Sequence, residues 1–212
     1  MLKKVHRLLK IPPGRGEGTA GTGNLESAQP VWTLAEIAGR LTEISGSGAA
    51  ASLTLIFSLV LEAQLEGEPV GWVTPSESFF YPPDAAQRGV DHDALVVARV
   101  SDAGAVPRAG ERLLRSGAFG LVVLDIGTAE IPTAHQARLV GLAHRHHAAL
   151  VCLTEKQERD PSLGSLVSLR VHAERTRTSE GQFACALKVL KDKRRGPTWA
   201  QAEVCRGPAG LR

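Results

Sequence analysis

The stretch LTEISGSGAAASLTLIFSLVLEAQL, residues Leu41–Leu65, decides the fold. Its first five residues, Leu41–Ser45, predict a buried strand. Gly46–Ala51 is a loop of small residues, and Ser52–Leu65 has the length and apolar content of a helix. A strand, a small-residue loop and a helix in this order are the arrangement in which many α/β domains bind phosphate groups.

Downstream of Leu65, short apolar runs alternate with helical patterns, which predicts an α/β fold with a mostly parallel sheet flanked by helices on both faces. Two further strands, Ser165–Thr176 and Gln182–Asp192, follow without an intervening helix and predict antiparallel strands at the C-terminal edge of the sheet. The other expected strands are Gly71–Thr74, Ala94–Val100, Gly120–Asp125 and Ala149–Thr154, and the expected helices are Ala105–Ser116 and Thr133–His147.

The length of 212 residues leaves room for one ordinary α/β domain with tails. Hydrophobic residues make up 43% of the chain and aromatic residues only 4%, so the core should be mainly aliphatic. We expect a core domain over residues 31–205, preceded by residues 1–30 and followed by a short tail, residues 206–212.

Residues 1–30 divide into two parts. Met1–Lys10 places apolar side chains at helical spacing between basic ones, whereas Ile11–Pro30 is rich in Gly, Pro, Ser and Thr and predicts a flexible linker. One interpretation of Met1–Lys10 is a frayed terminus, and the other is a helix that docks on a partner or on a second copy of the chain. The apolar residues of this candidate interface are Leu2, Val5, Leu8 and Leu9.

Charge and cysteine usage narrow the class of protein. The net charge of +3 is mildly basic and does not by itself indicate a nucleic-acid binder. Three cysteines without a C-x-x-C spacing favour a reducing compartment. No stretch is long and apolar enough to span a membrane, and no secretory signal is evident at Met1–Lys10. We therefore expect a cytoplasmic protein without membrane contacts.

The loop after Ser45 departs from a working phosphate loop of the G-x-x-x-x-G-K-[ST] type. In such a loop the glycines wrap the phosphates, the Lys neutralises their charge and the final hydroxyl binds Mg²⁺. The corresponding residues here are Gly46, Ser47 and Gly48, then Ala51, Ser52 and Leu53. With no Lys and no metal-binding hydroxyl, we expect no ATP hydrolysis, no catalytic residue and no cofactor. For this segment alone, a plain strand–loop–helix turn is the alternative interpretation.

Several motifs, taken in order, resemble the core of the RecA recombinase family. Gly39–Leu55 resembles its strand, phosphate loop and helix. Glu77 stands where that family carries a catalytic glutamate, before the turn Gly89-Val90-Asp91. Arg115–Ala118 and the strand that ends at Asp125 resemble its R-S-G-A segment and Walker B strand, which puts Asp125 at the Mg²⁺-associated position.

The resemblance extends from about Gly39 to Val204, because Lys188–Lys193 and Gln201-Ala202-Glu203 are similar to a late β-segment of the family. The differences lie in the loops. The first DNA-binding loop is nearly gone, and the second is reduced to Lys156–Gly164, directly after Glu155. Because the phosphate loop lacks its cation and its metal-binding hydroxyl, Glu77 and Asp125 are more simply interpreted as residual acidic positions that hydrogen-bond locally.

A short RecA-like chain with a degenerate phosphate loop resembles two bacterial groups, the ImuA-type proteins of the translesion mutasome and the SulA-like cell-division inhibitors. Length, the Walker B region and the basic late segment favour the ImuA type. The resemblance then implies a non-catalytic role in damage-induced (SOS) mutagenesis, with RecA and an ImuB-like Y-family protein as partners. A SulA-like division inhibitor and a weak DNA-binding regulator are the alternatives.

The basic segment KVLKDKRR supplies the second candidate interface. Lys191 and Lys193 match lysines that, in a RecA filament, reach the nucleotide of the neighbouring subunit, so this chain could offer them to RecA in trans. A solvated basic edge strand is the alternative, and weak or absent DNA binding is expected because few aromatic residues lie nearby. The residues of this interface are Lys188, Lys191, Lys193, Arg194 and Arg195.

A histidine cluster near the end of the expected helix Thr133–His147 completes the candidate residues. His144 and His147 share a helix face, but no Cys or carboxylate has the spacing of a further metal ligand. We therefore expect no metal site.

Overall fold

The computed structural model describes residues 32–46, 51–78, 85, 88–179, 182–197 and 199–206. The interface residues proposed at Leu2, Val5, Leu8 and Leu9 lie outside this part of the chain. So do the linker before residue 31, the loop residues Ser47 and Gly48, and residues 207–212 of the tail.

One sheet of eight strands runs through the molecule, in the order β3-β2-β4-β5-β1-β6-β7-β8. The pairs from β3 to β6 are parallel, whereas β6–β7 and β7–β8 are antiparallel. This arrangement confirms the expected fold class, including the antiparallel C-terminal edge. The strands are β1 (Leu41–Ser45), β2 (Val70–Pro75), β3 (Leu95–Val100), β4 (Leu121–Gly127), β5 (Ala149–Thr154), β6 (Leu169–Ser179), β7 (Gln182–Asp192) and β8 (Ala200–Arg206).

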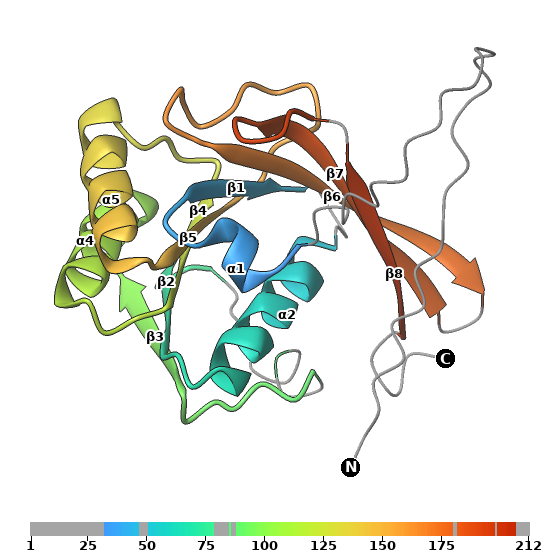
Figure 1. Ribbon diagram of the computed structural model, residues 1–212, viewed down its shortest axis with the longest axis horizontal. Helices are drawn as coiled ribbons and strands as arrows, with labels where there is room; N and C mark the ends of the chain where they lie inside the picture. Colours follow the sequence, from blue (N-terminus) through green and yellow to red (C-terminus); the bar gives the residue numbers. More distant parts are fainter. Residues whose placement is uncertain are drawn as a thin grey trace, which may run out of the picture.

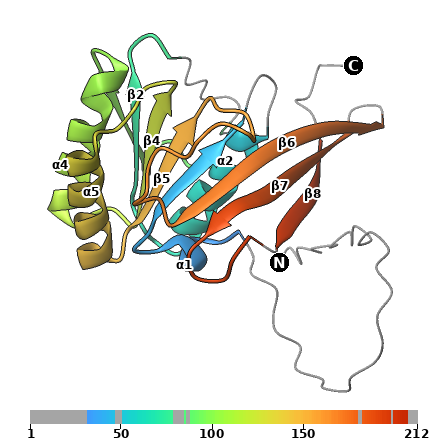
Figure 2. The ribbon, with the colours of Figure 1, turned by 90° about the horizontal axis from the view of Figure 1, so that it is seen from above.

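Helices cover the sheet from both faces, as Figures 1 and 2 show. On one face lie α1 (Leu34–Ile37) and α2 (Ser52–Leu65), and their side chains share a core with β1, β2 and the inner residues of β6 and β7. On the other face lie α4 (Val106–Ser116) and α5 (Thr133–His146), which share a second core with β4 and β5. The sheet thus separates two hydrophobic cores.

The cores are mainly aliphatic, as the composition predicts. An exception is Trp72 of β2, which stacks on Phe57 of α2 with ring centroids 5.6 Å apart. Because α2 is apolar over most of its circumference, it buries residues on several sides, from Leu55 to Ala63. This burial holds α2 in place against the sheet. A phosphate site in a fold of this kind would lie at the first turn of α2.

Three elements differ from the sequence expectations. The helix expected from Ala105 begins as a short 3-10 turn, Ala103–Ala105, whose start Asp102 caps, and α4 follows from Val106. The strand expected from Ser165 begins only at Leu169, so residues 155–168 form a loop. The apolar pattern predicts no strand at β8, since its sequence AQAEVCR has no apolar run.

Candidate functional site

The carboxyl end of β1 is held firmly by its neighbours. Gly46 N donates to Thr154 O of β5 over 3.3 Å. Ser45 Oγ donates to Val171 O of β6 over 3.2 Å and lies 3.1 Å from His172 Nδ1. The point where a phosphate loop would leave the sheet is therefore anchored on both sides.

The first turn of α2 presents an apolar surface. Ala51 precedes the helix with φ −81° and is fully buried, so its methyl group belongs to the core. Ser52 is 8% exposed, whereas Leu53 is 38% exposed. Among the described residues, no side chain caps this helix end. In this first turn, a buried Ser and an exposed Leu thus stand where the sequence comparison with a phosphate loop expects a Lys and a metal-binding hydroxyl.

Asp125 is held by two hydroxyl groups rather than by a cation. Its Oδ2 accepts hydrogen bonds from Thr74 Oγ1 at 2.8 Å and from Ser78 Oγ at 2.6 Å. Glu77 lies exposed in the turn after β2. The structure thus brings Asp125 to the hydroxyls of Thr74 and Ser78, and Glu77 lies next to Ser78 in the chain.

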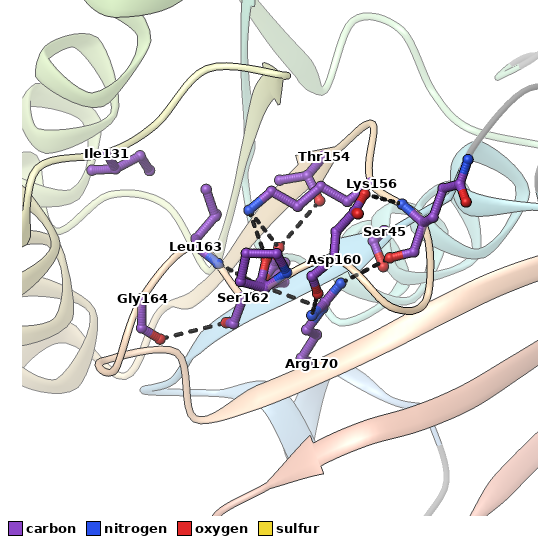
Figure 3. Close-up of polar contacts among 12 residues, drawn as sticks. Ser45, Ile131, Thr154, Lys156, Asp160, Ser162, Leu163, Gly164 and Arg170 are labelled. Carbon is purple, nitrogen blue, oxygen red and sulfur yellow. Dashed lines mark hydrogen bonds and ion pairs between the residues drawn. The ribbon is translucent and has the colours of Figure 1, made fainter.

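The most extensive polar cluster centres on Glu43 in β1 (Figure 3). This carboxylate is completely buried and accepts hydrogen bonds from Ser162 Oγ at 2.8 Å, Leu163 N at 3.0 Å and Thr154 Oγ1 at 3.3 Å. Two cations flank it, with Lys156 Nζ at 3.7 Å and Arg170 Nε at 3.8 Å. A buried negative charge is thereby joined to the start and the middle of the loop of residues 155–168 and to the first residues of β6.

Arg170 extends the same cluster to the loop backbone. Its guanidinium donates to the carbonyl oxygens of Asp160 and Gln157. The loop also closes on itself, because Lys156 Nζ donates to Pro161 O at 3.0 Å. From α5, Gln136 Nε2 donates to Leu163 O at 2.9 Å. The segment that resembles a reduced DNA-binding loop is therefore packed on the sheet by internal hydrogen bonds.

The lysines of the basic segment in β7 also contact this loop. Lys191 Nζ donates to Gly164 O at 3.3 Å, Lys193 Nζ donates to Ser165 O at 2.5 Å, and Lys188 pairs with Glu158. Burial, followed by the neighbouring Lys193 charge, lowers the pKa of Lys191. These three lysines hold the loop in place.

The two arginines that end the segment differ from each other. Arg195 forms an ion pair with Glu36 of α1 at 2.9 Å. Arg194 is exposed, and its backbone N donates to Asp192 Oδ1 at 2.9 Å. The five predicted basic residues thus lie along one segment. Four of them, Lys188, Lys191, Lys193 and Arg195, already bind other parts of the chain through their side chains.

A buried ion pair fixes the C-terminal end of β7. Arg40, just before β1, lies 2.6 Å from Asp192 Oδ1, and both side chains are almost fully buried. Arg40 Nε also donates to Ser168 Oγ at 2.9 Å. Burial acts to raise the pKa of Asp192, but the hydrogen bonds from Arg194 N, Arg40 and Trp199 outweigh it, and the pKa is lowered.

Sequence reasoning did not single out Glu43, Arg170, Lys156 or the Arg40–Asp192 pair. A signal was present, because Glu43 lies in the buried strand β1 and Arg170 in the buried first half of β6, and a charged residue inside a buried segment requires a partner. The partners of Glu43 lie more than a hundred positions away in the sequence, as Asp192 does from Arg40.

No metal site is formed by His, Cys, Asp or Glu side chains within the described residues. His144 and His146 end α5, and His147 caps it in the left-handed conformation with φ 54°. None of the described helices combines the length and the apolar character needed to cross a bilayer.

A strand–loop–helix start, a parallel sheet and an antiparallel C-terminal edge make this a RecA-like α/β fold. Protein RecA of Chlorobium chlorochromatii is 32% identical over 140 residues, which cover 58% of this chain and 39% of the relative. Protein RecA of Bifidobacterium breve is 30% identical over 106 residues, which cover 50% of this chain and 27% of the relative.

Protein RecA of Clostridium beijerinckii is likewise 30% identical over 106 residues, with 50% of this chain and 29% of the relative covered. No family model matches the chain. The chain spans less than half of the length of these curated relatives. Fold and sequence similarity together support a RecA-like superfamily assignment.

Proposed function

We propose that this chain is a non-catalytic RecA-like accessory protein that acts by binding other proteins in damage-induced mutagenesis. Its partners in this proposal are RecA itself and an ImuB-like Y-family protein, in the cytoplasm. The observation that carries the proposal is the first turn of α2, where Ser52 is buried and Leu53 is exposed. Such a helix start supplies no cation to the terminal phosphates of ATP and no hydroxyl to Mg²⁺.

The state of the acidic residues supports the same proposal. Asp125 already accepts hydrogen bonds from Thr74 and Ser78, and Glu77 is exposed in the turn next to Ser78. A hydrolytic site of this class needs a carboxylate near the metal and a second group that orients the attacking water. Asp125 is better explained as part of the local hydrogen bonding at the ends of β2 and β4.

Hydrolysis is the first test. We expect the purified chain to release no phosphate from ATP above background, with or without single-stranded DNA, while RecA under the same conditions does. Robust DNA-stimulated release by the purified chain would overturn the non-catalytic proposal.

Partner binding is the second test. We expect the full chain to co-purify with RecA assembled on single-stranded DNA in an ATP analogue, and with an ImuB-like protein. A RecA complex would use Lys191 and Lys193, so the variant Lys191→Ala/Lys193→Ala should bind RecA more weakly. Because both lysines hold loop carbonyls, Ser162→Ala serves as a control that perturbs the same loop without removing a positive charge. Equal affinity of the double variant and the wild type would discard the lysine contact.

A further inference from the structure

The outer surface of α4 and α5 carries a concentration of arginines that the function above does not use. Arg108, Arg112 and Arg115 follow one another on α4 at helical spacing, and Arg138 and His135 face them from α5. Together with Glu111 these residues line an open hollow of about 480 Å³. Figures 1 and 2 show the two helices side by side on the outside of the sheet. We call this the α4–α5 arginine surface.

Most of this positive charge is uncompensated. Glu111 is its one acidic residue and pairs with Arg115 at 2.6 Å and Arg138 at 3.2 Å. The side chains of Arg115 and Arg138 remain 65% and 49% exposed. Within the described residues, Arg108 and Arg112 take part in no ion pair and are exposed. The basic segment in β7 differs, since its lysines already bind the loop of residues 155–168.

The composition of the surface favours phosphate as its ligand. A guanidinium binds phosphate oxygens in a bidentate manner, and the arginines repeat along a helix of 11 residues, about 16 Å long. A protein partner would instead need an apolar anchor at the centre of the contact. Among the described residues, the exposed large hydrophobic side chains are Leu53, Leu65, Val96 and Val204, and none lies on α4 or α5.

The composition of the surface also favours duplex over single-stranded nucleic acid. Neither α4 nor α5 contains Phe, Tyr or Trp, the large aromatic side chains on which single-strand-binding proteins stack bases. We propose that the α4–α5 arginine surface binds the phosphate backbone of duplex DNA without reading its sequence. This places the DNA contact on the helices and not on the basic segment Lys188–Arg195.

Fluorescence anisotropy with a labelled duplex of roughly 30 base pairs, in about 50 mM salt and then at rising salt, tests the proposal. The full chain should bind, and Arg108→Gln/Arg112→Gln should weaken binding by roughly tenfold or more and reduce the salt slope by about 2. The matched control, Arg175→Gln/Arg177→Gln, removes two exposed arginines from β6 and should bind as the wild type does. Circular dichroism should show both variants folded.

Each remaining outcome counts against the proposal. No duplex binding by the wild type, or an equal loss in the two double variants, would overturn it. If Arg194→Gln/Arg195→Gln loses as much duplex affinity as Arg108→Gln/Arg112→Gln, the DNA contact includes the basic segment Lys188–Arg195. Tighter binding of a single strand that Arg108→Gln/Arg112→Gln leaves unchanged would also overturn it. If the chain binds a labelled polyglutamate peptide more strongly than the duplex, the ligand of this surface is an acidic protein segment and not DNA.

Discussion

At the scale of single residues, the buried charges Glu43, Arg170, Arg40 and Asp192 determine how the antiparallel edge joins the parallel sheet. Glu43 and Arg170 sit opposite each other in the register of β1 and β6, while Arg40 bonds to Asp192 at the end of β7. Replacing a buried ion pair by apolar residues often costs nothing, but removing one partner leaves an uncompensated buried charge. We therefore infer that these residues act in placing the strands more than in adding net stability.

Glu43→Gln should destabilise the fold by roughly 3 kcal/mol, because it leaves Arg170 and Lys156 without their buried counter-charge. Ser162→Ala, which removes one hydrogen bond to the same carboxylate, should cost about 1 kcal/mol. Urea unfolding followed by circular dichroism measures both changes. A larger effect for Ser162→Ala than for Glu43→Gln would show that the charge itself is unimportant.

The lowered pKa of Asp192 should make the free energy of unfolding depend on pH in the acidic range. Its pKa is lowered in the folded protein, so the unfolded chain binds the proton more readily. The stabilisation is present above the ordinary Asp pKa of about 3.9 and is lost as the pH falls through the lower folded value. Urea midpoints measured over this range should fall less steeply in Asp192→Asn than in the wild type, and parallel curves would contradict the prediction.

At the scale of elements, the connection after α4 shows how a turn is fixed by a neighbouring helix. Gly117 caps α4 in the left-handed conformation with φ 68°. A Cβ at this position would lie 2.8 Å from His146 Nδ1 at the end of α5. Gly141 within α5 has an ordinary helical backbone and nothing within 4 Å of such a Cβ.

Gly117→Ala should therefore destabilise the protein by about 1–2 kcal/mol through its left-handed backbone and the contact with His146. Gly141→Ala, the matched control, should stabilise it by about 0.5–1 kcal/mol because alanine favours the helix. Thermal unfolding measures both values, and melting temperatures that shift in the same direction would refute the argument.

Elements with a local signal could be predicted from the sequence, and those defined by distant contacts could not. The strand–helix alternation from Leu41 to Thr154 follows from apolar periodicity and was confirmed. β8 has almost no apolar signal and exists because β7 offers it a pairing edge. The lysines of β7 were expected at a free surface, yet they bind the loop of residues 155–168, whose approach depends on the whole fold.

At the scale of the whole molecule, one continuous sheet links the two cores. Cys152 of β5 lies in the core beneath α4 and α5, and Cys185 of β7 lies in the core beneath α2. Burial, followed by the Glu43 charge, raises the pKa of the Cys152 thiol, which suits an inert buried position. The two thiols lie on opposite faces and in different halves of the sheet, so the reactivity of each thiol monitors the unfolding of a different region.

Unfolding should therefore be cooperative across the sheet. If the wild type is labelled with a thiol reagent at increasing urea, Cys152 and Cys185 should become reactive at the same midpoint. Mass spectrometry of the digested peptides resolves the two sites in one sample. Earlier reaction of Cys185 would show that the antiparallel edge unfolds on its own.

The length of β6 has a consequence for local opening. Only Leu169–His172 pair with β1, whereas the strand continues to Ser179 with β7 as its partner. Amide protons near the base of this hairpin should exchange with solvent as slowly as those of the central strands, and exchange should quicken step by step toward the tip. We therefore expect the β6–β7 hairpin to stay closed where it leaves the sheet and to open most readily toward its tip, beyond the contact of Arg175 with the Phe183 ring.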